Sequence, residues 1–360
     1  MFDLLLDVQR NALNETFRAW ERTINAMRLP RIAADVQVAH TPHDVLYEED
    51  TLQLLRFRSD SIDVAEPILI CYALVNRPYI LDLQADRSVV RQLIKRGFDV
   101  YLIDWGVPTA ADRSLTLADY IDGFLKKIVT IVCSHSGSRQ LNLLGYCMGG
   151  TMSTIYTAMH QEQVRNLILM AAPIDFSGTE GLLNLWSREE LFDVDSLVDA
   201  YGNCPGSFLQ SCFQLRDPVQ NYLVKYMNFY EKMYDREFLE NFFVMERWTN
   251  DNIPVAGETF RQFVKKFYQQ NELVRGEFLL QGNPVRLDQI TCPILMLVAD
   301  RDDLVLAAST LALRDHVRSE DIESMSIDAG HIGLAVSSRA HRHLWPEAAM
   351  WIADRSTTRR

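Results

Sequence analysis

A cysteine stands between two glycines at the point where an apolar run ends. The run LNLLGYCMGG, residues 141–150, places Gly145, Cys147 and Gly149 in a Gly-x-Cys-x-Gly pattern. A buried structural thiol would need neither glycine, whereas a nucleophile presented in a sharp strand-to-helix turn needs small residues where the backbone approaches closely. With 16 Gly and 6 Cys among 360 residues, chance produces the pattern in roughly 1% of such sequences. The pattern predicts that Cys147 is a catalytic nucleophile.

The turn resembles the nucleophile elbow of α/β-hydrolases, with Cys in place of Ser. A helix that begins after Cys147 would point its N-terminal amides at the sulfur and favour the thiolate. The amide of Met148 is then expected to be one oxyanion donor. A second donor is expected from the loop after the first central strand, around Val75 and Asn76.

The same resemblance predicts an acid and then a histidine further along the chain. His331 lies in DAGHIG, just after the last strand-like run, where this fold presents its histidine. The acid should follow the run CPILMLVAD, and we expect Asp302, with Asp303 or Asp300 as alternatives. His331 would act as the base, and Asp302 would orient it. The remaining histidines are interpreted as ordinary helix, loop or surface residues: His135, His160, His316, His341 and His343.

Short apolar runs separated by helical stretches must position these residues. A hairpin, DVLYEED with TLQLLRFRS, precedes the runs PILICYALVN, DVYLIDWG, LNLLGYC, VRNLILMAAPID, CPILMLVAD and, more weakly, ESMSID. Continuous apolar runs suit strands covered by helices on both faces. Alternation of strand and helix indicates parallel pairing. The predicted fold is therefore an α/β-hydrolase fold with a mostly parallel central sheet flanked by helices.

Two segments lack this alternation of strand and helix. Between Asp175 and about Asp288 the chain has aromatic-rich stretches and no strand run, which predicts a mainly helical inserted lid over 176–285. At the N-terminus, apolar residues recur at helical spacing up to Pro30, where the helix is expected to end. That helix would pack on the domain or bind a partner. The apolar positions are Leu5, Leu6, Leu13, Phe17, Trp20, Ile24 and Met27. The expected division is an N-terminal helical segment 1–30, a core of 31–175 with 286–355, and the lid.

Composition excludes several classes of protein. The formal net charge is −12 with no basic stripe, which makes nucleic acid a poor partner. The six cysteines form no CxxC pair or metal-like cluster, so we expect no metal site and mostly buried free thiols in a reducing compartment. No apolar run reaches the roughly 18 residues that span a bilayer, and the N-terminus does not look like a signal peptide. A cytoplasmic protein is the expectation.

Several long stretches of the sequence, taken in their order along the chain, resemble the catalytic subunit of class III polyhydroxyalkanoate synthases. They are the stretch from YALVNRPYILDL to DVYLIDWG, the GYCMGG box, VRNLILMAAPIDF, AGETFRQFVKKFYQQN and AGHIG, and the similarity runs from about residue 40 to 355. The resemblance implies polymerisation of (R)-3-hydroxyacyl-CoA, typically 3-hydroxybutyryl-CoA, with release of CoA as a leaving group and no other cofactor. It assigns the catalytic Cys, Asp and His to Cys147, Asp302 and His331. It also implies a homodimer or hetero-oligomer with a second synthase subunit, and a place at the surface of cytoplasmic polyester granules.

The sequence departs from the family pattern directly after the acid. The family usually has Asp-His-Leu/Ile-Val-Pro, whereas this chain has Asp302-Asp303-Leu304-Val305-Leu306. A second carboxylate beside Asp302 should raise the proton affinity of the pair. Changed activity or substrate preference is one consequence to expect of this departure.

Two other functions compete with this one. Dienelactone hydrolases carry a similar Gly-Tyr-Cys-x-Gly-Gly elbow, which allows a cysteine-nucleophile hydrolase or acyl-CoA thioesterase, although those enzymes are shorter and lack an insertion like 176–285. An inactive granule-associated paralogue is the non-enzymatic alternative. The missing histidine at Asp303 favours it, and the presence of Cys147, Asp302 and His331 argues against it.

Overall fold

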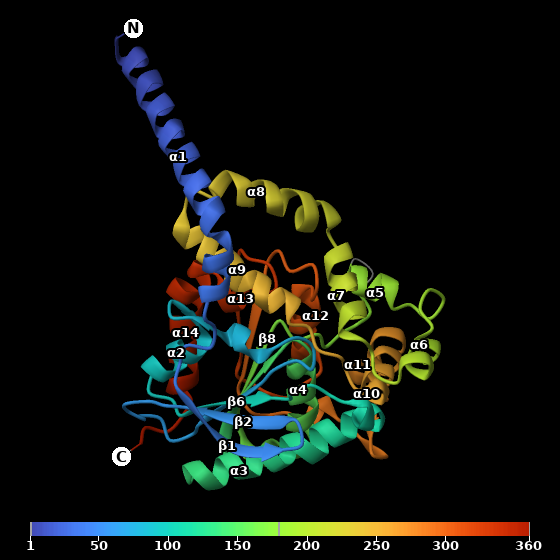
Figure 1. Cartoon of the computed structure of the whole chain (residues 1–360). Coiled ribbons are helices and arrows are strands. Elements are labelled where there is room, and N and C mark those ends of the chain that lie inside the picture. The colour runs from blue at the N-terminus through green and yellow to red at the C-terminus, as the bar shows by residue number, and fades with distance from the viewer. Residues whose placement is uncertain (1, 179–180, 360) are drawn as a thin grey trace. The chain divides into compact units, whose positions relative to one another are not determined.

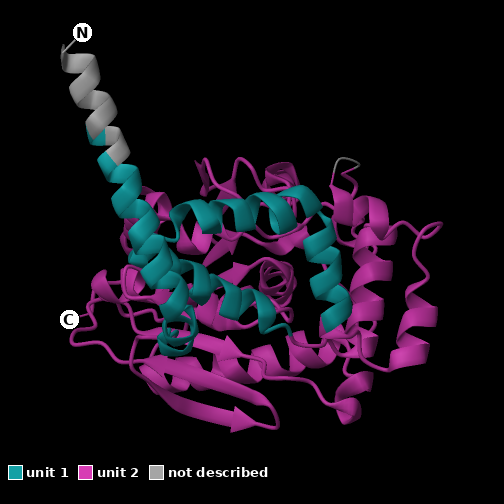
Figure 2. Cartoon of the chain, turned by 45° about the horizontal axis from the view of Figure 1, so that its top comes forward, with its two compact units in different colours: residues 1–38, 207–252 teal, residues 39–206, 253–360 magenta. Residues whose placement is uncertain are grey.

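The computed structural model describes residues 2–178 and 181–359, which form two compact units (Figures 1 and 2). The sheet unit comprises Ala39–Gly206 and Ile253–Arg360. The helical unit comprises Met1–Val38 and Ser207–Asn252. The segment expected to be one lid, 176–285, is therefore divided: its middle part joins the N-terminal helix, and its two flanks belong with the sheet. That any of it acts as a lid stays a prediction.

An eight-stranded sheet is the centre of the sheet unit, in the order β1-β2-β6-β3-β7-β8-β11-β12. The hairpin β1–β2 and the pair β2–β6 are antiparallel, and every other neighbouring pair is parallel. The bounds are β1 (His43–Glu49), β2 (Leu52–Phe57), β3 (Ile68–Cys71), β6 (Val100–Asp104), β7 (Leu141–Tyr146), β8 (Val164–Met170), β11 (Ile294–Ala299) and β12 (Ile322–Ile327). The mostly parallel sheet, the hairpin and each predicted strand run are confirmed.

Burial explains why these runs form this sheet. Every residue of the inner strands β3, β7 and β11 is buried, as continuous apolar runs predict for strands covered on both faces. The edge strand β12 is largely exposed or half-buried, which accounts for the weaker signal of ESMSID. Because the inner strands run parallel, their carboxyl ends meet at one edge of the sheet, and the loops that follow β7 and β11 lie at that edge.

Helices complete the sheet unit (Figure 1). They are α2 (Val89–Lys95), α3 (Lys126–Ser136), α4 (Met148–His160), α5 (Leu182–Trp186), α6 (Val194–Tyr201), α10 (Gly257–Gln262), α11 (Glu272–Arg275), α12 (Ala307–Leu311), α13 (Gly333–Val336) and α14 (Trp345–Asp354). Shorter 3₁₀ or π-helical turns cover Pro78–Leu81, Ala110–Ser114, Asp119–Leu125, Gln161–Gln163, Phe263–Gln269, Leu287–Gln289, Ala312–Asp315 and Ala340–Leu344. Two small hairpins add β4 (Asp82–Gln84) with β5 (Arg87–Ser88), and β9 (Leu279–Leu280) with β10 (Asn283–Pro284). The pair β9–β10 falls in the stretch where no strand was expected, since two-residue strands leave no periodic signal.

The helical unit joins the N-terminal helix to the middle of the predicted insertion (Figure 2). Its helices are α1 (Phe2–Asp35), α7 (Gly206–Leu215), a π-helical turn (Val219–Val224), α8 (Lys225–Lys232) and α9 (Arg236–Asn250). Its small core consists of Ile32, Met233 and Leu239, with Leu29 and several phenylalanines packed around them. The buried Asn25 amide also donates to the carbonyl of Met233 at 2.8 Å. Apolar burial and this hydrogen bond tie α1 to the turn between α8 and α9.

The prediction that Pro30 ends the first helix is wrong, because α1 continues to Asp35. Proline removes one amide donor and crowds the preceding turn, which usually ends a helix. Here Leu29 and Ile32, on either side of Pro30, both pack into the core of the helical unit, and this packing offsets the lost hydrogen bond. Several other predicted apolar positions of α1 are exposed: Leu13, Phe17, Trp20 and Met27. The side chains of Leu5 and Leu6 lie outside the described residues.

Among the helices that the structure describes, none is long and apolar enough to cross a membrane.

Candidate functional site

The turn between β7 and α4 holds Cys147 in a strained conformation. Strand β7 ends at Tyr146, and α4 begins at Met148, so Cys147 alone forms the corner, with φ of 52° and ψ of −127°. A positive φ is rare for a residue with a side chain and costs energy that the surrounding structure must offset. The Cys147 amide donates to the Met170 carbonyl at the end of β8 at 2.9 Å, and the Cys147 carbonyl accepts from the Gly150 amide at 2.8 Å. These bonds fix the corner from both sides.

The glycines around Cys147 allow three close backbone approaches. A Cβ on Gly149 would lie 2.2 Å from the carbonyl oxygen of Cys71, at the end of β3. A Cβ on Gly145 would lie 2.5 Å from the Cα of Gly150. A Cβ on Gly150 would lie 2.3 Å from the side chain of Ala172. The need for small residues at Gly145 and Gly149 follows from the sequence pattern, whereas the need at Gly150 comes from a contact with the chain after β8.

His331 and Asp302 meet beside this corner. The imidazole Nδ1 of His331 lies 2.7 Å from the carboxylate Oδ2 of Asp302, and both residues are buried. The other oxygen, Oδ1, accepts hydrogen bonds from the amides of Leu304 at 2.9 Å and Val305 at 2.8 Å. The carboxylate is thereby held in one orientation, with its free edge toward the imidazole.

Only one of the three candidate acids occupies this position. Asp300 and Asp303 have exposed side chains, whereas Asp302 is 5% exposed and faces His331. The backbone turns after β11, and the paired amides of Leu304 and Val305 draw the Asp302 carboxylate inward. The structure therefore brings Cys147, Asp302 and His331 together, from three separate loops at the carboxyl edge of the sheet.

Charge stabilises a protonated imidazole at this site. Burial alone would lower the pKa of His331, but the negative charges of Cys147 and Asp302 and hydrogen bonds to both side chains raise its pKa to about 10. A protonated His331 held between Cys147 and Asp302 is placed to donate a proton to a leaving group.

Three tyrosines lie within electrostatic range of Cys147. The ring of Tyr146 stacks on the imidazole of His331 with centroids 5.1 Å apart, and its hydroxyl donates to the His331 carbonyl at 3.2 Å. Tyr72 packs edge-on against Tyr146. Burial raises the pKa of Tyr72, Tyr146 and Tyr268, and the charge of Cys147 raises each further, so all three phenols stay protonated. The rings of Tyr72 and Tyr146 therefore form an aromatic layer against the His331 imidazole.

The predicted oxyanion donors lie in two segments. Met148 opens α4 directly after the nucleophile. Val75 and Asn76 lie in the loop between β3 and the turn at Pro78–Leu81, and this loop begins at Cys71 and Tyr72, against the first turn of α4. Asn76 has a left-handed φ of 65°, and its side-chain Oδ1 is buried without a hydrogen-bond partner. Their role as donors stays a prediction.

The other cysteines and histidines have ordinary environments. Burial raises the pKa of Cys71 and Cys292 to about 12 and that of Cys133 to about 11, which makes these thiols unreactive at neutral pH. His160 pairs with Asp122 at 2.9 Å. His341 was expected on a surface helix, and this is wrong: it is 6% exposed, because its Nε2 bonds the Ala335 carbonyl at 2.7 Å. Among the described residues, no cluster of three or more His, Cys, Asp or Glu could hold a metal ion.

Sequence reasoning missed the three tyrosines. Tyr146 immediately precedes the nucleophile, so its place in the box was a usable signal. Tyr72 follows β3, and Tyr268 lies in the helical segment far along the chain, where no spacing rule connects either of them to Cys147. Only the folded chain shows that they share one site.

This sheet order, with a strained nucleophile after β7 and a His–Asp pair from the loops after β11 and β12, defines a protein of the α/β-hydrolase fold. Residues 66–337 match the family described as alpha/beta hydrolase fold. A solved structure of a monoglyceride lipase variant from Saccharomyces cerevisiae has a TM-score of 0.58 at 14% identity, over 90% of this chain and 99% of that one. The lipase from Paleococcus ferrophilus gives 0.55 at 12% identity, over 85% and 100% of the two chains. At such identities the likeness shows the fold alone.

Sequence relatives define the family more narrowly. Residues 21–93 match the Poly-beta-hydroxybutyrate polymerase (PhaC) N-terminus. The Poly(3-hydroxyalkanoate) polymerase subunit PhaC of Haloferax mediterranei is 46% identical over 98% of this chain and 72% of that protein. The protein of the same name from Allochromatium vinosum is 39% identical over 97% of this chain and 99% of that protein. The chain belongs to the family of poly(3-hydroxyalkanoate) polymerase subunits PhaC.

Proposed function

We propose that this chain polymerises (R)-3-hydroxyacyl groups, carried as CoA thioesters, into a polyester with release of CoA. The observation that carries the proposal is the buried His331–Asp302 pair beside the strained Cys147, in a chain of the PhaC family. The smallest common substrate of this type, (R)-3-hydroxybutyryl-CoA, is the first to test.

In the first step Cys147 becomes acylated. Its sulfur attacks the thioester carbonyl, the new carbon–sulfur bond replaces the bond to CoA, and the proton on His331 passes to the leaving CoA sulfur. One thioester replaces another, so the step is nearly isoenergetic and the acyl group remains activated. The amide of Met148, with a second donor from Val75 or Asn76, would stabilise the oxyanion of the tetrahedral intermediate.

In the second step a 3-hydroxyl group attacks the Cys147 thioester. His331 accepts the hydroxyl proton as the oxygen–carbon bond forms and the carbon–sulfur bond breaks, and the carboxylate of Asp302 stabilises the resulting imidazolium. Replacing a thioester by an ester supplies the driving force of chain growth. Water competes with the hydroxyl group for the same carbonyl, so the site must exclude it, and the buried rings of Tyr72 and Tyr146 beside His331 would serve that purpose.

Assembly and location extend the proposal. The relatives carry the name of a polymerase subunit, which supports a complex with other chains. We propose that the partner is a second synthase subunit, that the chain also forms a homodimer or hetero-oligomer, and that the complex works at the surface of cytoplasmic polyester granules. CoA takes part as the leaving group, and no resident cofactor is required.

The test is CoA release from (R)-3-hydroxybutyryl-CoA followed by analysis of the product, with the chain alone and with a candidate partner subunit. Insoluble polyester supports the proposal. Free 3-hydroxybutyrate as the main product would instead identify a thioesterase. An absence of CoA release in both conditions would favour an inactive paralogue.

A further inference from the structure

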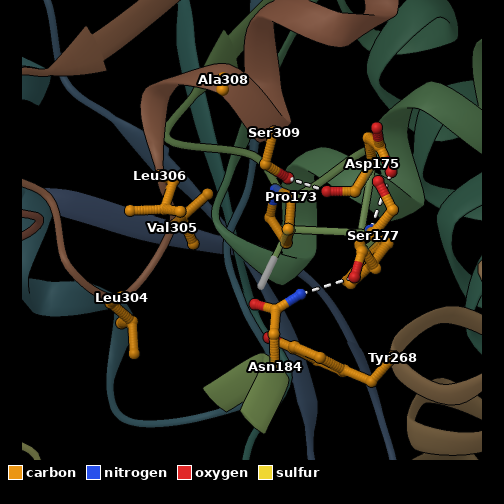
Figure 3. Close-up of a pocket in the computed structure, with 12 residues that line it drawn as sticks. Pro173, Asp175, Ser177, Asn184, Tyr268, Leu304, Val305, Leu306, Ala308 and Ser309 are labelled. Atoms are coloured by element: carbon orange, nitrogen blue, oxygen red, sulfur yellow. Dashed lines mark hydrogen bonds between the residues drawn. The ribbon is translucent and has the colours of Figure 1, made fainter. Parts of the chain in front are cut away.

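A pocket of about 190 Å³ lies in the sheet unit (Figure 3). Its walls come from the chain after β8, from α5, from the segment after Asp302 and from the turn that ends α10. The lining residues are Pro173, Asp175, Phe176, Ser177, Gly178, Asn184, Tyr268, Leu304, Val305, Leu306, Ala308 and Ser309.

The pocket shares one wall with the catalytic site. Leu304 and Val305 line the pocket, and their amides hold the Asp302 carboxylate. Tyr268 also lines it and packs edge-on against Phe176, another lining residue. A group bound in the pocket would therefore lie against the segment that holds Asp302, the partner of His331.

The two sides of the pocket differ in polarity. In Figure 3 the side chains of Leu304 and Leu306 lie on the opposite side from Asp175 and Ser177. The polar side is rigidly built, because the hydroxyl of Ser309 donates to the Asp175 carbonyl at 2.6 Å and the Ser177 amide donates to the Asp175 carboxylate at 2.9 Å. One side thus suits an alkyl group, and the other suits a hydroxyl group that can donate a hydrogen bond.

Leu306 reaches across this space. A Cβ on Gly178, on the far side, would lie 3.8 Å from the Cδ1 of Leu306, so the tip of the leucine is in van der Waals reach of the opposite segment. The side chain therefore limits how far a bound group can extend. Leu306 is also the position at which the family pattern usually has proline, which lacks such a reach.

We infer that the pocket receives the 3-hydroxyacyl group carried by Cys147, and that Leu306 limits the length of its alkyl substituent. This inference rests on the proposed function. A cavity of about 150 Å³ accommodates benzene, which has about as many non-hydrogen atoms as a 3-hydroxybutyryl group. The pocket is of a size for that group, with its alkyl end against Leu304 and Leu306 and its 3-hydroxyl group, as a hydrogen-bond donor, toward the carboxylate of Asp175.

The experiment compares CoA release from (R)-3-hydroxybutyryl-CoA and (R)-3-hydroxyhexanoyl-CoA by the full chain and by Leu306→Ala. The ratio of kcat/KM for the longer to the shorter substrate should rise about tenfold in Leu306→Ala, because added methylenes gain apolar contact. Leu306→Phe should lower the same ratio, which keeps the test decisive if the alanine variant is unstable. The matched control is Leu279→Ala in β9, an exposed leucine that is not among the pocket-lining residues, and this variant should leave the ratio unchanged.

An unchanged ratio in both Leu306 variants would overturn the inference. An equal fall for both substrates would also overturn it, because the pocket would then serve the CoA moiety or the fold rather than the acyl chain. If the unaltered chain releases CoA from neither substrate, with or without a partner subunit, the proposed function itself fails, and this outcome is distinct from failure of the pocket assignment.

Discussion

Two aromatic-rich parts of the predicted insertion differ in how deeply their side chains are buried. In the sheet unit, Phe176, Phe263 and Phe267 are buried and pack ring against ring, with Phe176 and Phe267 stacked at 5.5 Å. In the helical unit, Tyr222 and Tyr226 are about half exposed, and several other large apolar side chains are exposed to a similar or greater extent. Both stretches read as aromatic helices in the sequence, but their side chains are buried in one unit and largely exposed in the other.

This difference marks the limit of what helical periodicity in a sequence can predict. The exposed residues of the second stretch recur every three or four positions along the chain: Leu215, Val219, Tyr222, Leu223, Tyr226, Met227 and Tyr230. Phe229 of α8 and Met233, directly after α8, instead pack in the core of the helical unit. Periodicity therefore identifies an apolar face, but it does not identify which face meets a core or which core that is.

The largest expected effect comes from comparing a cysteine-to-alanine substitution in the sheet unit with one in the helical unit. Cys147→Ala should reduce CoA release from (R)-3-hydroxybutyryl-CoA by at least about 10³-fold, because it removes the nucleophile. Cys212→Ala changes a cysteine of the helical unit whose pKa is raised by burial, and it should retain most of the activity. Steady-state kinetics of both variants measure the difference. Comparable losses would mean that Cys147 has no special role.

Asp302→Asn should lower kcat by about 10²- to 10⁴-fold, because the imidazole loses both its orienting partner and the charge that stabilises its cation.

Since the pKa of His331 is raised in the folded chain, its protonation contributes stability below about pH 6.5, and this contribution is lost as the pH rises toward about 10. The cost of Asp302→Asn to the free energy of unfolding should therefore shrink across that interval. Urea denaturation between pH 6 and 10 measures it, and a cost independent of pH would contradict the charged pair.

Paired aromatic truncations test the contrast in packing. Phe267→Ala should cost about 3–5 kcal/mol of stability, because it opens a cavity in a fully buried aromatic cluster. Tyr226→Ala, at an exposed position of the helical unit, should change stability by no more than about 0.5 kcal/mol. Thermal or chemical denaturation compares the two variants. Similar costs would show that the second stretch is as well packed as the first.

The smallest effect is expected from removing single hydroxyl groups. Tyr146→Phe keeps the stacked ring but loses a hydrogen bond to the His331 carbonyl, which is worth about 1 kcal/mol or roughly a fivefold fall in kcat. The matched control is Tyr222→Phe, whose hydroxyl donates to Gln214 at 2.6 Å in the helical unit. That variant should leave kcat unchanged. An equal effect of both substitutions would argue against a positioning role for Tyr146.

Much of the fold could be predicted because its signals are local. The strands around Cys147 are continuous apolar runs, and the glycines at Gly145 and Gly149 are required by contacts within the turn and with the end of β3. The choice among Asp300, Asp302 and Asp303 was harder, since the deciding factor is the direction in which backbone amides draw a carboxylate.

The parts that could not be predicted depend on distant partners. Pro30 does not end α1, because packing against residues more than two hundred positions away holds the next turn. The segment 176–285 divides between two units for the same reason. Tyr268 belongs to the site through a contact that no sequence spacing encodes.

The central claim is that Cys147 carries the acyl group as a thioester. The most direct measurement is rapid acid quenching after mixing with (R)-3-hydroxybutyryl-CoA, followed by mass spectrometry of the peptide that contains Cys147. The account predicts an acyl adduct on this cysteine that hydroxylamine removes and that is absent from Cys147→Ala. CoA release without any adduct on Cys147, or an adduct on another residue, would contradict it.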